Sequence, residues 1–270
     1  MSRLNQLQAE GFLQTPPLWD NRQFEIEQFD FPEIDLTNFN VEAVSQKLRL
    51  GHQMEYIFKQ LVLHSNKYEI LLHNLPIKDG NRTIGEIDFI LKDGQTGTLI
   101  HIELTYKFYI IDSQIADPIH RLIGPNKRDT FFAKMEKIKN KQFQLIHSEE
   151  GSKALNKIQI DHKLIEHQAC CKAQLFTPFQ LKERSIKPLN KACICGYWLH
   201  FEDLKAAYFK SFQFYIPMKS EWVIEPHDDV KWNSYFKACT NINQHILKEN
   251  APMVWLRKAD AEYEKFFVVF

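Results

Sequence analysis

Residues 85–91 are Gly-Glu-Ile-Asp-Phe-Ile-Leu, and residues 99–108 are Leu-Ile-His-Ile-Glu-Leu-Thr-Tyr-Lys-Phe. In both segments apolar and polar side chains alternate, which is typical of strands with one apolar and one polar face. The segment between them contains Asp93-Gly94-Gln95-Thr96-Gly97 and is typical of a hairpin turn. The pattern therefore predicts an antiparallel hairpin of two half-buried strands.

The register of this hairpin predicts a concentration of negative charge. A loop over residues 94–97 pairs Asp93 with Thr98, so that Asp88 lies directly opposite Glu103 on the polar face. Directly opposed residues have Cβ atoms about 4.5–5.5 Å apart, and like charges there destabilise the pairing. A divalent cation removes this penalty, because hard cations bind carboxylate oxygens. We therefore predict a metal site at Asp88 and Glu103, with an ordinary solvated polar face as the alternative.

The segment before the hairpin has helical spacing. Between Val41 and Leu63 the apolar residues recur at intervals of three and four. Glu55 lies at the margin of this apolar stripe, one turn after Gly51, which would allow another backbone to approach closely. We predict a helix there, with Glu55 either extending into water or serving as a third acid near the hairpin.

The remaining pattern predicts a mixed α/β fold. A first strand is predicted over residues 68–75, ending before Pro76. The further predicted elements are helices over residues 129–145, 152–160 and 229–248, strands over 172–178, 212–217 and 253–256, and a buried or edge-paired apolar tail over 266–270. Helices alternating with strands in this way favour an α/β layer with helices on both faces.

One basic segment follows the hairpin. Its candidate nucleic-acid-binding residues are Lys127, Arg128, Lys134, Lys137 and Lys141, the last three at helical spacing. The formal net charge of the chain is +0, so binding of a polyanion requires either a local basic patch of this kind or a partner that delivers the nucleic acid. The alternative is a solvated helix face.

The acids of the hairpin resemble those of the PD-(D/E)XK nuclease superfamily, which carries an acid on one strand, Glu-x-Lys on the next, and a helical Glu. Asp88 matches the first acid, Glu103 the second and Glu55 the helical Glu. Thr105 stands at the usual lysine position, and Lys107 is the next lysine on that face, about 7 Å further along the strand. The resemblance implies a restriction-endonuclease-like core in the order helix-strand-strand-strand-helix-strand.

The same resemblance implies a site chemistry. Asp88, Glu103 and Glu55 would bind Mg²⁺ or Mn²⁺, and Lys107 would act with these three acids in catalysis. More narrowly, the chain resembles the bacterial domain-of-unknown-function family 1853, from Leu48-Arg49-Leu50-Gly51 through Gly124-Pro125-Asn126 and, with a fainter likeness, into the C-terminal third. That family implies a nuclease-like fold and supplies no known substrate.

These observations lead to a domain division and a function. We expect an N-terminal arm (residues 1–40), a nuclease-like core (41–190) and a C-terminal α+β extension (191–270) packed on the core. The expected activity is Mg²⁺-dependent hydrolysis of phosphodiester bonds by metal-activated water, with nucleic acid, DNA in particular, as the substrate. The alternative is an inactive relative that acts as a nucleic-acid- or protein-binding scaffold.

Composition bears on location. No run approaches the roughly 18–20 apolar residues of a membrane span, and Met1 to Asp20 lacks the basic-then-apolar order of a secretory signal. The chain has 5 cysteines, an odd number that favours reduced thiols. Neither Cys170-Cys171 nor Cys193-x-Cys195 has the spacing of common zinc sites, so buried thiols are favoured over a second metal site. We expect a cytoplasmic protein.

Overall fold

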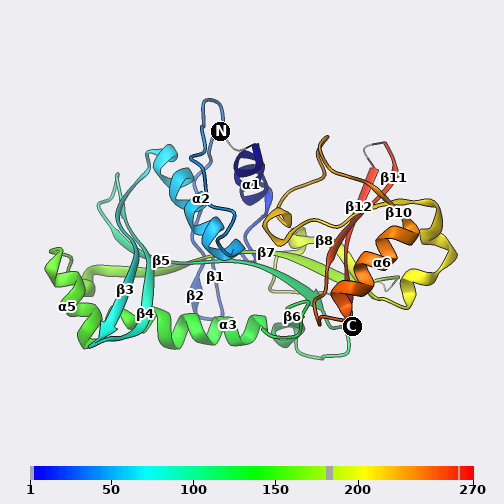
Figure 1. Cartoon of the computed structure of the whole chain (residues 1–270). Coiled ribbons are helices and arrows are strands. Elements are labelled where there is room, and N and C mark those ends of the chain that lie inside the picture. The colour runs from blue at the N-terminus through cyan, green and yellow to red at the C-terminus, as the bar shows by residue number, and fades with distance from the viewer. Residues whose placement is uncertain (1–2, 181–184, 261) are drawn as a thin grey trace. The chain divides into compact units, whose positions relative to one another are not determined.

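The computed structural model describes residues 3–180, 185–260 and 262–270 (Figure 1). The chain forms two compact units that interleave along the sequence. Unit 1 comprises Met1–Leu13, Pro17–Tyr106 and Ala133–Lys172, and unit 2 comprises Gln14–Pro16, Lys107–Phe132 and Ala173–Phe270. The sequential division into residues 1–40, 41–190 and 191–270 stays a prediction.

Four strands form the sheet of unit 1. They are β3 (Tyr68–Asp79), β4 (Arg82–Asp93), β5 (Leu99–Ile111) and β7 (Ile165–Pro178), in the spatial order β7-β5-β4-β3. The last residues of β5 and β7 belong to unit 2. β3 continues through Pro76, where the sequence predicted its end, because β3 is the edge strand and one edge of it makes no ladder hydrogen bonds.

The predicted hairpin register is confirmed. β4 and β5 pair from Lys92↔Leu99 to Phe89↔Ile102, and the Asp93 N–H donates to the Thr98 carbonyl at 2.9 Å. The Gly97 N–H closes the turn on the Asp93 carbonyl at 2.9 Å, and Gly97 has a positive φ of 75°. Glycine adopts that conformation without the steric cost of a side chain. The turn thus fixes which residues of the two strands face each other.

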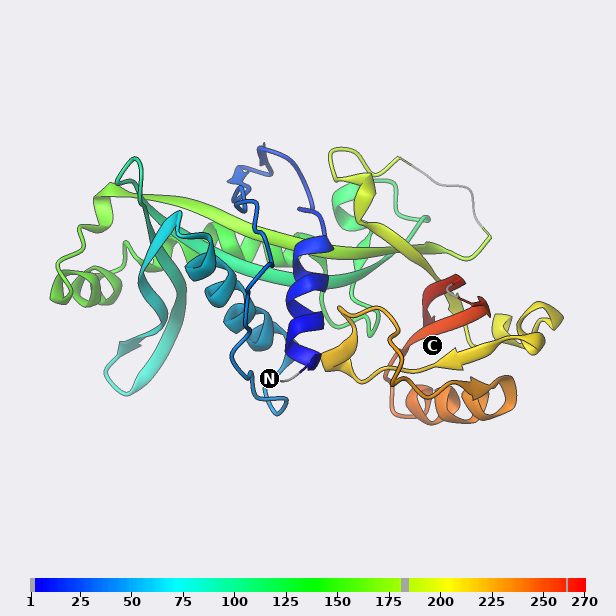
Figure 2. The same ribbon diagram turned by 90° about the horizontal axis from the view of Figure 1, so that it is seen from above.

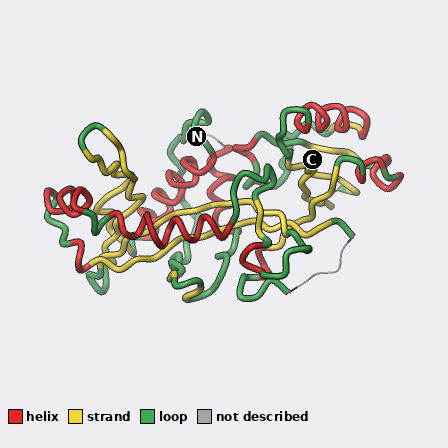
Figure 3. Tube along the Cα trace, turned by 90° about the horizontal axis from the view of Figure 1, so that it is seen from below, coloured by secondary structure: helices red, strands yellow, loops and turns green. Residues whose placement is uncertain are grey.

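The principal helices of unit 1 start at other residues than predicted. α2 spans Leu50–Ser65 and begins nine residues after Val41, and it ends at Asn66 in the left-handed conformation (φ 54°). α5 spans Glu149–Lys157 and begins earlier than predicted, because Ser148 Oγ accepts from the Gly151 N–H and caps it. The predicted helix over residues 129–145 is α3 (Phe131–Lys137), a π-helical turn η2 (Ile138–Gln142) and α4 (Phe143–Leu145) (Figure 3).

The N-terminal residues of unit 1 pack on its core. α1 (Arg3–Gln14) lies beside α2 in Figure 2, and Gln8 Nε2 donates to Gln53 Oε1 at 2.7 Å. Short strands β1 (Arg22–Gln23) and β2 (Ile26–Glu27) follow. The rings of Phe29 and Phe31 lie 5.9 and 5.5 Å from that of Phe58 in α2. This aromatic cluster anchors the arm.

The prediction of half-buried strands is wrong. β4 is buried on both faces from Ile87 to Leu91, and His101 and Glu103 of β5 are 0% exposed. On one face Phe58 of α2 packs on Phe89 at 4.7 Å, and on the other Phe143 of α4 packs on His101 at 5.8 Å. The polar face of the hairpin is therefore enclosed by helical residues, which alternation within a strand does not reveal.

Unit 2 carries a mixed sheet. Its strands are β6 (Leu122–Ile123), β8 (Ile194–His200), β9 (Gln213–Tyr215), β10 (Asn233–Ser234), β11 (Met253–Ala259) and β12 (Glu262–Val269), in the order β10-β9-β11-β12-β8-β7-β5 with β6 on β5. β12 runs parallel to β8 and antiparallel to β11. α6 (Tyr235–Ile246) packs through Ala238 and Ile242 on a core with Val268. The protein is thus a mixed α/β protein.

Short 3-10 helices complete the described structure: η1 (Pro118–His120), η3 (His162–Leu164), η4 (Lys191–Cys193), η5 (Asp203–Lys205), η6 (Ala207–Ser211) and η7 (Lys219–Glu221). Among the described residues, no helix has both the length and the apolar character needed to span a bilayer.

Candidate functional site

Asp88 and Glu103 lie where β4 and β5 stop pairing. Their positions follow the last ladder pair, Phe89↔Ile102, by one residue on each strand. Asp88 Oδ2 accepts a hydrogen bond from the backbone N–H of Leu104 at 2.9 Å. The carboxylate of Asp88 thereby takes the place of a backbone acceptor, which holds it against β5 beside Glu103.

Both strand acids are buried, whereas Lys134 is half-buried and Lys137 is exposed. Asp88 is 8% exposed and Glu103 is 0% exposed. Burial raises the pKa of Glu103 to about 8, and the nearby ammonium groups of Lys134 and Lys137 only partly oppose this. Burial, followed by repulsion from Glu103, raises the pKa of Asp88 well above its usual value. At neutral pH the pair therefore favours a bound proton or a bound cation.

Two side chains form hydrogen bonds with Glu103. His101 Nε2 lies 3.2 Å from Glu103 Oε1, and Gln142 Nε2 donates to Glu103 Oε2. Lys134 Nζ donates to Gln142 Oε1 at 3.3 Å, which turns the amide nitrogen of Gln142 toward Glu103. Gln142 is the last residue of the π-helical turn. Such turns shift the phase of a helix and frequently occur at functional sites.

Glu55 contributes a third negative charge. It projects from α2, and its Oε2 lies 3.0 Å from His52 Nδ1 and accepts from Asn74 Nδ2 at 3.1 Å. Its charge raises the pKa of both Asp88 and Glu103. The helical Glu named from the resemblance therefore lies close enough to act on the two strand acids.

Asn74 is a site residue that the sequence reasoning did not identify. It lies on β3 between the pairs His73↔Phe89 and Leu75↔Ile87, opposite Asp88. Its φ is +51°, a left-handed conformation in the middle of a strand. Its Oδ1 is buried and has no hydrogen-bond partner. The only sequence signal is an amide side chain within the predicted strand over residues 68–75.

A line of histidines leads away from Glu103. His101 Nδ1 lies 3.1 Å from His167 Nδ1, His167 Nε2 lies 2.9 Å from His147 Nε2, and His147 Nδ1 lies 3.1 Å from His162 Nδ1. Burial lowers the pKa of His101 and of His167 to about 3, so both rings are neutral. A neutral imidazole donates from one nitrogen and accepts at the other, so the four rings form one continuous hydrogen-bonded chain.

The predicted catalytic lysine is held by a neighbour. Lys107 lies further along β5, and its Nζ is 2.8 Å from Asp129 Oδ2 in an ion pair that is 37% and 46% exposed. Of the predicted basic residues, Lys127 donates to the Phe270 carbonyl at 2.8 Å and Arg128 to the Glu249 carbonyl at 3.4 Å. These three lysine and arginine side chains belong to unit 2.

The other predicted basic residues belong to unit 1. Lys137 and Lys141 are exposed, whereas Lys134 is half-buried. Lys134 Nζ donates to Gln142 Oε1 at 3.3 Å, and Gln142 in turn donates to Glu103. The positive charge of Lys134 lowers the pKa of both Asp88 and Glu103. The predicted basic surface is therefore not a uniform solvated helix face.

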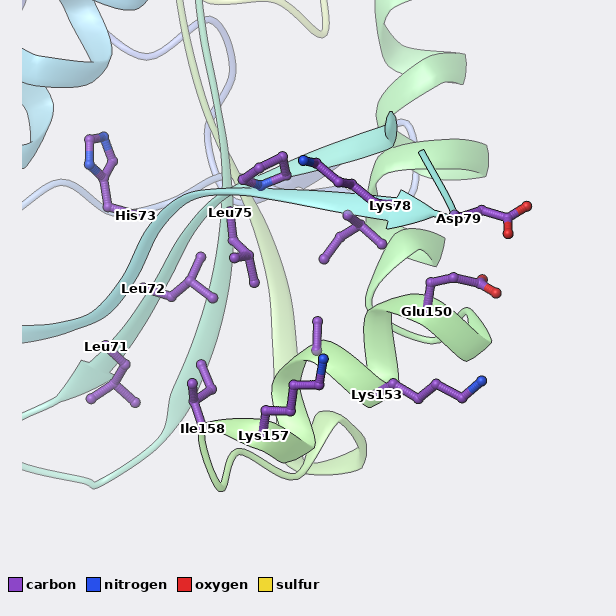
Figure 4. Close-up of a pocket in the computed structure, with 14 residues that line it drawn as sticks. Leu71, Leu72, His73, Leu75, Lys78, Asp79, Glu150, Lys153, Lys157 and Ile158 are labelled. Atoms are coloured by element: carbon purple, nitrogen blue, oxygen red, sulfur yellow. The ribbon is translucent and has the colours of Figure 1, made fainter. Parts of the chain in front are cut away.

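A groove opens beside β3 in unit 1 (Figure 4). Leu72, Leu75 and Ile158 supply apolar lining. Its charged lining residues are Lys78, Lys153, Lys157, Asp79 and Glu150. Because both signs of charge are present, the groove defines no class of ligand by charge. Its lining includes neither Asp88 nor Glu103.

The described residues contain no metal centre built from histidine, cysteine and carboxylate side chains alone. Over residues 3–180, 185–260 and 262–270, no three such side chains converge closely enough to hold a metal ion. The histidine chain is linear, because His147 uses different ring nitrogens toward His162 and His167. Cys170 and Cys171 are free and buried, and burial raises the pKa of the Cys170 thiol to about 12. The prediction of a cation at Asp88, Glu103 and Glu55 stays a prediction.

The fold and the site define a mixed α/β protein with a buried carboxylate pair on adjacent strands. The chain belongs to the family described as Domain of unknown function (DUF1853), whose model matches residues 13–269. No curated protein and no solved structure matches the chain.

Proposed function

We propose that the protein is a divalent-cation-dependent nuclease of the PD-(D/E)XK type, which hydrolyses phosphodiester bonds in nucleic acid, DNA in particular. The observation that carries this proposal is the buried pair Asp88 and Glu103, opposed on adjacent antiparallel strands with Glu55 nearby. In support, α2 is followed by β3, β4 and β5, and then, after the short strand β6, by the helices α3, α4 and α5 and by β7. The proposal takes α2, β3, β4, β5, α3 and β7 as the core elements that the resemblance implies. Two buried like charges are costly unless a cation or protons accompany them.

The donor set fits a hard cation. The side chains at the site present carboxylate and amide oxygens, which suit Mg²⁺ or Mn²⁺. Asp88 and Glu103 would hold the ion, with Glu55 approaching from α2. A bound ion there would supply a Lewis acid for a phosphoryl oxygen and would lower the pKa of a bound water.

The surrounding residues would prepare the acids for this role. His101 and Gln142 each bond one oxygen of Glu103, which fixes the orientation of its carboxylate and leaves a lone pair on each oxygen. Lys134 places a positive charge near both strand acids, where it would also attract a phosphate group. Lys107 would orient the attacking water or stabilise transition-state charge only after leaving its ion pair with Asp129.

A second function is favoured by two specific observations. Thr105 occupies the usual lysine position, and Lys107 is engaged by Asp129. Both fit a protein that has kept the nuclease fold as a nucleic-acid- or protein-binding scaffold without cleaving its ligand. The retained carboxylate pair argues for the enzyme, because a scaffold gains nothing from two buried acids in repulsion.

A cleavage panel tests the proposal. Single-stranded, duplex and branched DNA and RNA are incubated with the protein in Mn²⁺ or Mg²⁺, with D88N as the catalytic knockout and K107A and K134A as tests of the two lysines. Cation-dependent cleavage that is lost in D88N supports the nuclease. Binding without cleavage, unchanged in D88N, supports the scaffold. Cleavage that is equal in the wild type and D88N contradicts the proposal.

A further inference from the structure

One buried polar atom beside the acids has no protein partner. Asn74 Oδ1 is buried and accepts no hydrogen bond, although Asn74 Nδ2 donates to Glu55 Oε2 at 3.1 Å. Most buried side-chain acceptors in folded proteins are satisfied, and an unsatisfied one calls for a specific explanation. The amide cannot be turned round to solve this, because its oxygen would then face the carboxylate oxygen of Glu55.

The backbone at the same residue is also unusual. A φ of +51° lies in the left-handed region, and Asn74 adopts it within β3 between the ladder pairs at His73 and Leu75. Asparagine tolerates this conformation better than most residues, but a left-handed residue is uncommon inside a continuous strand such as β3. Backbone conformations of this kind cluster at ligand-binding and active sites. Two unfavourable features therefore coincide at one residue opposite Asp88.

The position of Asn74 links the acids of three elements. It lies opposite Asp88 on β4, Asp88 is bonded to β5 next to Glu103, and the amide of Asn74 is bonded to Glu55 of α2. In the described part of the chain no three acidic, histidine or cysteine side chains converge to hold a metal ion, so an ion at Asp88 and Glu103 would take its other oxygen ligands from water or from an amide. An amide oxygen is a normal ligand for hard divalent cations.

We infer that Asn74 supplies a neutral oxygen ligand, through Oδ1, to a divalent cation bound at Asp88 and Glu103. This inference rests on the proposed cation site and adds a ligand to it. An occupied site would give the buried oxygen the partner that it lacks. It also gives the left-handed backbone at Asn74 a reason, namely to aim the amide at the acids.

The test measures Mn²⁺ binding by titration calorimetry, with the apo protein freed of metal by EDTA. N74G removes the amide oxygen and accepts a positive φ without strain, so that it is expected to fold. N74D keeps an oxygen ligand and the tolerance of a positive φ, but it cannot donate to Glu55. Near-UV circular dichroism and thermal unfolding of the apo proteins check that each variant is folded.

The two variants separate a ligand from a residue that only positions Glu55. If Asn74 is a ligand, N74G weakens Mn²⁺ binding at least about tenfold, or about 1.4 kcal/mol, and N74D binds as tightly as the wild type or more tightly. Equal affinity of N74G and the wild type overturns the inference. An equal loss in N74G and N74D overturns it as well, because both variants lose the donor to Glu55. If the wild type binds no Mn²⁺ at millimolar concentration, the proposed cation site itself fails.

Discussion

Replacing Glu103 by Gln should make the protein more stable at pH 8 than the wild type, and about equally stable at pH 5. Gln has the shape of a protonated Glu and carries no charge. Burial raises the pKa of Glu103 from 4.5 to about 8 in the folded protein. Between these values the folded state binds more protons than the unfolded state, so the free energy of unfolding falls as pH rises.

The magnitude follows from the same shift. Ionising Glu103 costs the folded protein about 3 to 4 kcal/mol between pH 5 and pH 8, when the folded pKa is about 8 and the unfolded pKa 4.5. This is an upper limit, because water entry and movement of Lys134 toward the charge reduce the cost. E103Q does not pay this free energy of ionisation, because Gln carries no charge. The histidines titrate in both proteins, so their effect on stability cancels when the two proteins are compared.

Urea unfolding of the wild type and E103Q in EDTA at pH 5, 6, 7 and 8 measures this difference. The stability of E103Q relative to the wild type should increase steadily with pH. E69Q, which changes an exposed glutamate of β3, is the matched control and should show a flat difference. If the difference in stability between E103Q and the wild type also stays constant from pH 5 to pH 8, the claim that Glu103 is a buried acid held in its neutral form is refuted.

Three other results follow from the structure. K107A should reduce cleavage but leave Mn²⁺ binding intact, because the ion pair of Lys107 is with Asp129, which is not a predicted cation ligand. D129A, which breaks the same ion pair, is the control. If K107A cleaves as fast as the wild type, Lys107 has no part in the mechanism. The wild type should lose stability as the pH falls from 6.5 toward 3, because burial lowers the folded pKa of His167 to about 3 and the unfolded state binds more protons in that range. H167Q should make this loss of stability smaller. H200Q, which changes an exposed histidine, should leave the loss as it is in the wild type. F58A should cost about 3–5 kcal/mol in urea unfolding, because the ring is fully buried against Phe89, and a loss below about 1 kcal/mol would contradict the packing.

Local patterns were sufficient to predict the hairpin. Alternation in residues 85–91 and 99–108 located both strands, and the turn at Asp93–Gly97 fixed the register that sets Asp88 opposite Glu103. These features depend on neighbours in sequence, so sequence periodicity carries them. The resemblance added Glu55, whose charge the structure places near both acids.

Longer-range features were not predictable from those patterns. The polar face of β5 is enclosed because Phe143 and Gln142 pack on it from a helical segment some forty residues later in the chain. The π-helical turn that brings Gln142 to Glu103 breaks the 3.6-residue period on which helix predictions rest. Asn74 was missed because its left-handed backbone and buried oxygen are visible only in three dimensions.

Proton release on Mn²⁺ binding tests the proposed cation site most directly. Calorimetry at pH 7 in buffers of different ionisation enthalpy gives the number of protons displaced per ion. Because the pKa of Glu103 is about 8 and that of Asp88 is raised as well, the apo pair holds protons that an arriving ion must expel. We predict saturable binding with release of about one proton or more, lost in D88N. Binding that releases no protons, or that is the same in D88N, would contradict the site.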